Sequence, residues 1–306
     1  MELYENKELF KEIIIQASEF FNIDESLIEK DYYVTLVLRN AVRKIDGLVF
    51  KGGTSLSKGY HLINRFSEDV DLSLNLENFT QSRKRGAVVE LINVIHELKL
   101  NLNNETGILN HTHGNYNCYE IEYPISFANG VTKPQLIVEM TYIQKSYPTN
   151  VRKISFMISD FLSNHHREDI IKEYDLESFN IECQSVERTL IDKAFALGDY
   201  YLKNQAIRNS RHIYDIHMIV SSLDDEALKN LKSFIEEIRD VRKKNKSCSS
   251  AQDDQNLNDI LKAIVSNSFF KKDYEEITNK LLWVQCPYDT SIESIKHLID
   301  IGIFDR

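Results

Sequence analysis

Several signatures of common protein classes are rare or absent in this sequence. The chain has only four cysteines, none of them in a C-x-x-C pair, which argues against a structural zinc site. No apolar run reaches the roughly 18 residues that a membrane helix needs. We find no G-x-G-x-x-G fingerprint, Walker lysine or serine-hydrolase elbow. The first residues are acidic and mixed rather than signal-like, so we expect a cytoplasmic protein without a membrane partner.

The sequence is also poor in chain-breaking residues and in positive charge. Only four prolines and ten glycines occur among 306 residues, which favours long regular elements. The formal net charge is −10 and the pI is near 5.5, which argues against a protein that coats nucleic acid through bulk charge. A local basic groove that holds a nucleic-acid end remains compatible with this composition.

The hydrophobic patterning predicts a mixed α+β fold in two domains. We expect a mixed α/β core with N-terminal helices over residues 1–160 and a helical C-terminal domain over 161–306. Asp24 is a candidate N-cap for the second helix. Residues 240–257 are polar and poor in apolar side chains, which predicts an exposed, flexible loop. The expected helices cover 7–22, 24–43, 54–61, 82–99, 185–203, 207–222, 257–282 and 290–302, and the expected strands cover 48–50, 69–76, 116–123, 135–142 and 151–158.

The most informative stretch pairs a glycine turn with two aspartates. Gly52 and Gly53 follow a short apolar strand, and Asp69 and Asp71 lie one residue apart in a later strand. Residues i and i+2 of a strand point to the same face, so the two carboxylates repel each other. A hard cation such as Mg²⁺ would relieve this repulsion while it binds substrate phosphates. Because a Gly-Gly turn lets the backbone approach a phosphate closely, the stretch predicts a nucleoside triphosphate site.

A third carboxylate on a neighbouring strand would complete a site for two metal ions. Glu139 lies in the apolar strand Ile137-Val-Glu-Met-Thr141 and is the candidate, although a glutamate that points to solvent is the plain alternative. Glu120 and Glu122 are weaker competitors. His111 and His113 with Cys118 form a still weaker candidate metal group, since the segment around them is typical of a loop.

Two helical segments add positive charge. Lys193 lies in the apolar stripe of a predicted helix. Either its ammonium group reaches solvent at the margin of that stripe, or it binds a triphosphate as a point charge. Arg208, Arg211 and Asp215 lie at i, i+3 and i+7 of another predicted helix, which favours a shared face. A plain helix pair between Arg211 and Asp215 is the simpler alternative.

With these residues in view, the chain resembles the AbiEii-like nucleotidyltransferase toxins of type IV toxin–antitoxin (abortive-infection) systems, which are similar to polymerase-beta-like transferases. The likeness spans roughly residues 25–220 and rests on four segments. These are Glu29-Lys-Asp-Tyr-Tyr-Val-Thr35, Phe50-Lys-Gly-Gly-Thr-Ser-Leu-Ser57, Arg65-Phe-Ser-Glu-Asp-Val-Asp-Leu72, and Lys193 with Arg211-His-Ile-Tyr-Asp215.

The resemblance implies a polymerase-beta-like core, a mixed sheet with flanking helices, followed by an all-helical domain. It implies a cytoplasmic toxin that uses a nucleoside triphosphate with Mg²⁺, or alternatively Mn²⁺, to modify an RNA, with the tRNA 3′ end as the expected acceptor. Such a toxin blocks translation, acts in phage defence, and is neutralised by a cognate antitoxin that is a transcriptional regulator.

The resemblance also assigns roles to residues. Asp69, Asp71, Lys193 and Asp215 are the expected catalytic residues, and Asp69, Asp71 and Glu139 the metal ligands. The expected triphosphate-binding residues are Gly52, Gly53, Thr54, Ser55, Lys58, Arg208 and Arg211. The family reads Gly-Ser where this chain reads Gly53-Thr54-Ser55, so either hydroxyl could contact phosphate.

Two other functions stay open at this point. The same chemistry could transfer a nucleotide to a protein or a small molecule, which the negative net charge mildly favours. The fold could also be a binding module that holds a nucleotide without turnover, although a full set of carboxylates argues against it.

Overall fold

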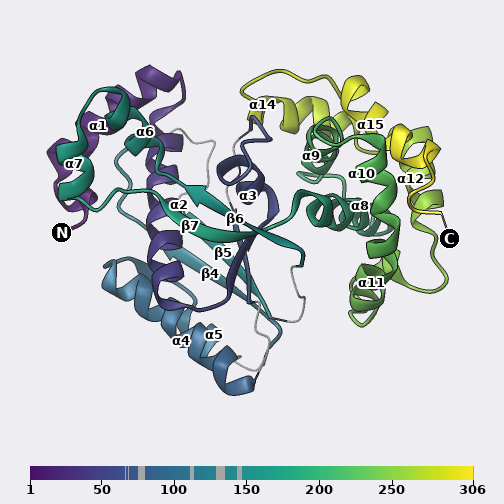
Figure 1. Cartoon of the computed structure of the whole chain (residues 1–306), viewed down its shortest axis with the longest axis horizontal. Coiled ribbons are helices and arrows are strands. Elements are labelled where there is room, and N and C mark those ends of the chain that lie inside the picture. Colours follow the sequence, from purple (N-terminus) through teal and green to yellow (C-terminus); the bar gives the residue numbers. More distant parts are fainter. Residues whose placement is uncertain are drawn as a thin grey trace. The chain divides into compact units, whose positions relative to one another are not determined.

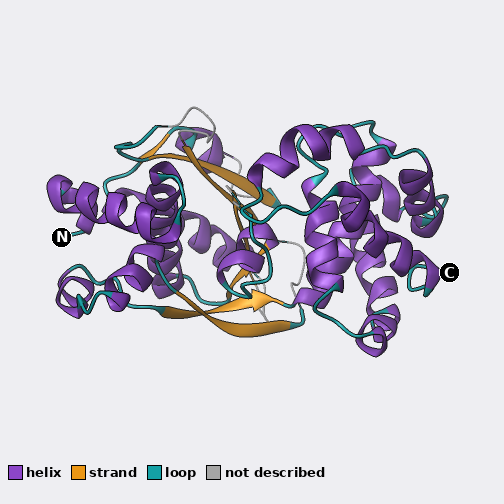
Figure 2. Ribbon diagram, turned by 90° about the horizontal axis from the view of Figure 1, so that it is seen from above, coloured by secondary structure: helices purple, strands orange, loops and turns teal. Residues whose placement is uncertain are grey.

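The computed structural model describes residues 1–65, 67, 69–74, 80–110, 114–128, 135–142 and 147–305. The chain divides into two compact units. Unit 1 comprises Met1–Tyr60 and Ser67–Gln184, and unit 2 comprises His61–Phe66 and Ser185–Arg306. The strands lie in unit 1, whereas unit 2 is built from helices (Figure 2).

Unit 1 contains a mixed sheet and the helices that cover it (Figure 1). Its helices are η1 (Leu3–Glu5), α1 (Lys7–Phe21), α2 (Glu25–Lys44), α3 (Gly52–Lys58), α4 (Gln81–Glu97), α5 (Glu105–Asn110), α6 (Met157–Asn164) and α7 (Glu168–Glu173). Its strands are β1 (Leu48–Lys51), β2 (Asp69–Leu74), β3 (Asn101–Leu102), β4 (Tyr116–Glu122), β5 (Gln135–Thr141), β6 (Thr149–Ile154) and β7 (Phe179–Gln184).

Within the described ranges, the sheet has the strand order β3-β4-β5-β2-β1-β7-β6. The pairs β2–β5 and β1–β7 are parallel, and the other neighbours are antiparallel. The central position of β1 and β2 places the glycine turn and the two aspartates in the middle of the sheet.

The two faces of the central strands differ in exposure, as the alternation of the sequence predicts. Along β5, Leu136, Val138 and Met140 are fully buried, whereas the alternate residues are partly exposed. The buried side chains join one apolar core with residues of α2 and α4. The acidic residues lie on the opposite, partly exposed face.

The N-terminal helices begin where the sequence predicts. The Asp24 carboxylate accepts a hydrogen bond from the Ser26 N–H, so the expected cap of α2 is confirmed. Asn22 ends α1 in the left-handed conformation, which asparagine adopts readily. In Figure 1, α1, α6 and α7 lie together near the N-terminus.

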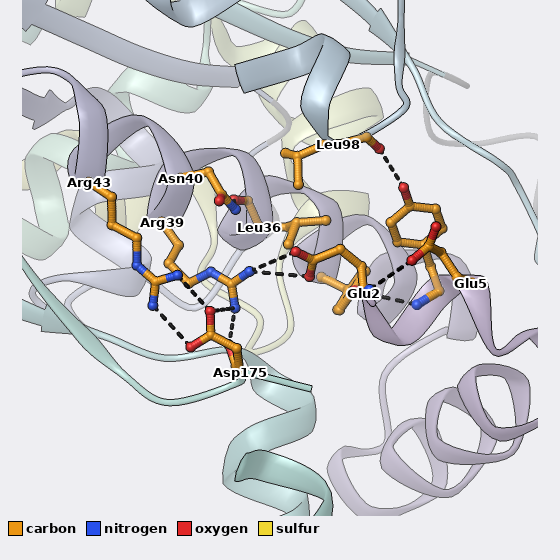
Figure 3. Close-up of polar contacts among 10 residues, drawn as sticks. Glu2, Glu5, Leu36, Arg39, Asn40, Arg43, Leu98 and Asp175 are labelled. Atoms are coloured by element: carbon orange, nitrogen blue, oxygen red, sulfur yellow. Dashed lines mark hydrogen bonds and ion pairs between the residues drawn. The ribbon is translucent and has the colours of Figure 1, made fainter. Parts of the chain in front are cut away.

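A buried arginine ties the chain's first turn to α2 (Figure 3). The side chain of Arg39 is 1% exposed, and its guanidinium lies 3.2 Å from Glu2 and 3.4 Å from the Asp175 carboxylate. Arg43 approaches the same Asp175 carboxylate at 2.6 Å from the solvent side. Because a buried guanidinium must be paired, these contacts fix the positions of η1, α2 and the segment before β7.

The division into units lies after Gln184, whereas the sequence predicts a boundary at residue 160. The intervening residues contain α6, α7 and β7. Strand β7 pairs with both β1 and β6 and thus belongs to the sheet. The predominantly helical signal beyond residue 160 conceals this strand, because Phe179–Gln184 is short and alternates only weakly.

Unit 2 packs its helices around α8 and α9, and the expected α+β class with a helical C-terminal part is confirmed. Its helices are α8 (Val186–Leu202), α9 (Arg211–Val220), α10 (Asp225–Asn230), α11 (Lys232–Lys243), η2 (Ser249–Ala251), α12 (Leu257–Ser266), α13 (Lys271–Asp273), the π-helical turn η3 (Tyr274–Thr278), α14 (Asn279–Leu281) and α15 (Tyr288–Asp300). Across the described ranges, every helix is too short or too polar to cross a membrane.

The polar segment 240–257 is more ordered than its composition predicts. Ser250 is 1% exposed, and both its N–H and its hydroxyl donate to the Asp199 carboxylate, at 2.8 Å and 2.7 Å. Arg239 donates to the backbone carbonyls of Gln252 and Gln255. The segment is thus exposed at residues 244–247, 253 and 254, as expected, whereas Ser250 and Ala251 are buried.

Candidate active site

Four side chains form a row across the central strands of unit 1. The strand register pairs Lys51 with Asp71, Asp71 with Glu139, and Glu139 with Cys118. Directly paired residues of neighbouring strands present their side chains on the same face about 5 Å apart. The predicted third carboxylate therefore lies beside the D-x-D strand, and a lysine and a cysteine flank the acidic pair.

Asp69 adds a second acidic position to this face. Asp69 and Asp71 are partly exposed, while Val70 between them is fully buried on the opposite face. Burial raises the pKa of Glu139, and the negative charges of Asp71 and Asp69 raise it further. Three carboxylates thus repel one another on one face, where Lys51 offers only partial compensation.

The glycine turn lies directly against this row. Gly52 has a φ of +74°, a conformation that favours glycine. A Cβ on Gly52 would lie 1.9 Å from Oδ2 of Asp71. The backbone of the turn therefore contacts the carboxylate itself, so that a phosphate bound at the turn would lie next to a cation bound at Asp71.

The two hydroxyls that follow the turn already have partners in the fold. The Thr54 hydroxyl donates to the backbone carbonyl of Asp69, which ties α3 to the start of β2. The Ser55 hydroxyl is hydrogen-bonded to the Cys183 thiol, whose pKa burial raises to about 11. Both side chains are buried, at 3% and 2% exposure. Of the two, Thr54 makes the contact that holds the turn against the aspartate strand.

Lys58 forms an ion pair with Asp31 of α2. The other oxygen of Asp31 accepts the Met157 N–H at 2.9 Å. Glu29, two residues earlier, accepts the N–H groups of Ser126 and Phe127 at 2.8 Å and 3.0 Å. The conspicuous Glu29-Lys-Asp31 sequence thus anchors α3, α6 and the segment after β4, and Lys58 takes part in that scaffold.

The chemistry of the acidic row fits a divalent cation. Carboxylate oxygens are the ligands that Mg²⁺ and Mn²⁺ take, and a cation would relieve the repulsion among Asp69, Asp71 and Glu139. Within the described ranges, no three His, Cys, Asp or Glu side chains are already gathered closely enough to hold a metal ion. The fit rests on register and charge, and side-chain rotation would close the site. His111 and His113 lie outside the described residues.

The competing glutamates lie elsewhere on β4. Glu122 accepts hydrogen bonds from the side-chain amides of Asn101 and Asn103, at 3.2 Å and 2.9 Å, at the end of the sheet. Glu120 pairs in register with Ile137 rather than with an acidic residue. Their positions favour Glu139 as the third carboxylate.

Unit 2 contains a separate buried cluster of charges. Asp215 is 0% exposed, and its carboxylate accepts from Arg65 at 2.7 Å and 2.8 Å and from Lys193 at 2.5 Å. Burial alone raises the pKa of Asp215, but the two cations outweigh burial and hold the pKa well below its usual range. Arg65 and Lys193 thus share the Asp215 carboxylate.

The positive charge extends along α9. Burial lowers the pKa of Lys193, and Arg65 and Arg211 lower it further against the opposite effect of Asp215. His212 stacks on Tyr200 with 5.6 Å between ring centroids, and burial followed by Lys193 keeps its pKa well below 6.5. Lys193, Arg65 and Arg211 therefore lie close enough for their charges to act on one another.

The expected helical face with Arg208 is wrong. Helix α9 begins at Arg211, and Arg208 lies before it with a φ of 63° and an exposed side chain. The Asp273 carboxylate accepts the backbone N–H groups of Arg208 and Ser210, which holds the chain in a turn. Helical spacing therefore applies to Arg211 and Asp215 but not to Arg208.

Sequence reasoning missed the roles of Arg65, Tyr116 and Cys118. Arg65 stands four positions before Asp69, and its partner Asp215 is 150 positions away, so only the fold reveals the pair. Tyr116 and Cys118 flank Glu139 through the β4–β5 register. The alternation of β4 could have placed these two side chains on one face, but not beside β5.

Comparisons with known proteins show the family and the fold. A family model described as "Nucleotidyl transferase AbiEii toxin, Type IV TA system" matches residues 36–284. The fold is similar to that of MenT4, a nucleotidyltransferase toxin from Mycobacterium tuberculosis H37Rv. That match has a TM-score of 0.53 at 16% identity and covers 92% of this chain and 85% of that chain. No curated protein matches the chain.

Proposed function

This chain belongs to the AbiEii family of nucleotidyltransferase toxins, and on that premise we propose that it transfers a nucleoside monophosphate from a nucleoside triphosphate to the 3′ end of an RNA. We propose a tRNA as the acceptor and Mg²⁺ as the cofactor. Loss of usable tRNA would block translation and stop phage growth in an infected cell. As the toxin of a toxin–antitoxin system, it implies a cognate antitoxin, for which we propose a transcriptional regulator.

The observation that carries the proposal is the contact between the glycine turn and the acidic row. Asp71 lies against Gly52 on one side and beside Glu139 on the other. Nucleotidyl transfer needs a triphosphate held next to carboxylates that position metal ions. Gly53 and Ser55 would border the phosphates, and Asp69, Asp71 and Glu139 would hold the cation.

The reaction is a substitution at the α-phosphorus. The acceptor's 3′ oxygen forms a bond to the α-phosphorus, the bond from that phosphorus to the oxygen bridging to the β-phosphate breaks, and pyrophosphate leaves with the bond electrons. The hydroxyl proton passes to a carboxylate of the row or to water. Bound Mg²⁺ would polarise the α-phosphate and lower the pKa of the attacking hydroxyl.

The residues of unit 2 enter the proposal through their charge. Lys193 and Arg211 would contact the triphosphate and stabilise the negative charge that develops on it. Asp215 is fully buried between Arg65 and Lys193, so we assign it the role of holding these cations in place. Lys58 serves the scaffold through its pair with Asp31.

The test is incubation of the protein and Mg²⁺ with each labelled nucleoside triphosphate in turn and with total RNA. We expect label at the length of tRNA, and none with the Asp69→Asn, Asp71→Asn double variant. Full transfer by that variant would contradict the assigned site. Label in protein or in small molecules, with none in RNA, would show a different acceptor. Tight triphosphate binding without transfer to any fraction would show a binding module.

A further inference from the structure

Tyr116 is a half-exposed aromatic side chain beside the acidic row. It begins β4, pairs in register with Thr141, and lies two residues from Cys118, the partner of Glu139. Residues 116, 118 and 120 share one face of β4, and by register this is the face that carries Glu139 and Asp71. The Tyr116 side chain is 48% exposed.

Burial raises the pKa of Tyr116, and the negative charge of Glu139 raises it further, which fits a phenol close to the acidic row. A half-exposed aromatic ring at this place offers a surface for stacking.

The order of the strands assigns this ring to one side of the reaction. Across the sheet, the glycine turn at the end of β1 comes first, followed by Asp69 and Asp71 on β2, Glu139 on β5 and Tyr116 on β4. In phosphoryl transfer the attacking and leaving oxygens lie roughly in line through the phosphorus. If the leaving pyrophosphate lies at the glycine turn, the attacking hydroxyl approaches from the β5–β4 side.

Tyr116 is therefore placed on the acceptor's side of the carboxylates. Strand spacing separates its backbone from that of Glu139 by about 5 Å across the sheet and about 7 Å along it. This offset suits a sugar hydroxyl near Glu139 with its own base over the ring. Any base can stack on an aromatic ring, so the surface would accept an unpaired end without reading its sequence.

We propose that Tyr116 is the stacking surface for the terminal base of the acceptor strand, and that the acceptor is consequently an RNA with an unpaired 3′ nucleotide. This inference rests on the proposed function and adds the side from which the acceptor enters. In this arrangement Tyr116 contacts the acceptor strand directly, and the triphosphate binds on the opposite side of the acidic row.

The test compares Tyr116→Ala, which removes the ring, with Tyr116→Phe, which keeps the ring and removes the hydroxyl. Stacking is worth about 1–3 kcal/mol per base, so Tyr116→Ala should raise the KM for unfractionated tRNA by about 5-fold to 150-fold. The KM for the nucleoside triphosphate should stay within about 2-fold of wild type. Tyr116→Phe should keep a KM for tRNA close to that of wild type.

A matched control is Phe20→Ala. Phe20 is also 48% exposed but lies on α1, away from the sheet's acidic face. It should leave both KM values unchanged and so measures the general effect of removing an exposed aromatic ring. The proposal is overturned if Tyr116→Phe raises the KM for tRNA as much as Tyr116→Ala does, or if the triphosphate KM rises instead.

Direct binding separates this proposal from the transfer reaction. A fluorescent single-stranded RNA oligonucleotide is titrated with wild type and with Tyr116→Ala in the absence of triphosphate. Weaker binding by Tyr116→Ala supports the stacking surface even if wild type transfers nothing to RNA, in which case only the proposed function fails. Equal binding by the two proteins, or no binding by wild type, overturns the stacking surface.

Discussion

Gly52→Ala is the substitution whose effect the structure predicts most specifically. The residue has a φ of +74°, and its Cα lies so close to Asp71 that an added Cβ would be 1.9 Å from the carboxylate oxygen. A single methyl group therefore tests two claims together. One is that the turn requires a left-handed residue, and the other is that the turn contacts the strand β2, which carries Asp69 and Asp71.

The expected cost has two parts. A non-glycine residue in the left-handed region costs about 1–2 kcal/mol. At roughly 2–4 °C per kcal/mol, this part lowers the melting temperature by about 2–8 °C. The turn or the Asp71 side chain must also move by about 1 Å to relieve the overlap. Misplacement by about 1 Å can cost a factor of about 100 in rate, so we expect transfer to fall at least that far.

The assay is transfer of labelled nucleotide, measured alongside thermal unfolding of the same preparation. Gly86→Ala is the matched control, because Gly86 lies in α4 with nothing within 4 Å of an added Cβ. Alanine in a helix interior is favoured over glycine by about 0.5–1 kcal/mol, so this control should gain stability and keep its activity. If Gly52→Ala retains transfer within about 3-fold of wild type, the assignment of the turn to the site is refuted.

Other changes separate chemistry from stability. The Asp69→Asn, Asp71→Asn variant should lose more than about 100-fold in transfer, since a catalytic cation is worth several kcal/mol, yet it should keep or gain thermal stability because like charges are removed. Asp215→Asn should destabilise the protein by about 3–5 kcal/mol in urea unfolding at pH 7, because two buried cations lose their partner. Arg65 and Lys193 outweigh burial and hold the pKa of Asp215 lower in the folded chain than in the unfolded chain. The stability that the ionised Asp215 contributes is therefore fully present above the unfolded pKa of about 3.9 and is lost as the pH falls. The difference in unfolding free energy between wild type and Asp215→Asn should therefore become smaller in acid. Lys193→Met should raise the triphosphate KM and leave RNA binding unchanged, as fluorescence titration with an RNA oligonucleotide would show.

Local signals in the sequence predicted much of unit 1. The cap at Asp24, the buried strand that ends at the glycine turn, and the alternation around Asp69 and Asp71 all depend on neighbouring residues, and the structure contains each of them. Glu139 could be proposed because a charged residue between two buried apolar residues, Val138 and Met140, suggests a functional role. Such inferences succeed because periodicity and capping act within a few residues.

The pairing of segments that are distant in the chain could not be predicted from the sequence. The order of the strands decides that Glu139 neighbours Asp71, and nothing in either strand alone reveals that β5 runs parallel to β2. Arg208 was misplaced for a related reason. The helical pattern of α9 can be extended backwards to Arg208, but the carboxylate of Asp273 at the end of α13 accepts the Arg208 N–H, and the chain there is not helical.

The buried cluster of unit 2 shows why a conspicuous charged residue need not touch substrate. Asp215 holds Arg65 through two hydrogen bonds, and Arg65 belongs to the segment His61–Phe66, which the chain enters after the glycine turn and leaves just before Asp69. Loss of Asp215 would release the segment that contains Arg65. An inactive Asp215 variant could therefore be explained by displacement of the Arg65 segment as well as by loss of a direct catalytic role of Asp215. Contact between Asp215 and the substrate would be indicated only by an Asp215 variant that keeps the stability of wild type and yet has a changed affinity for the triphosphate.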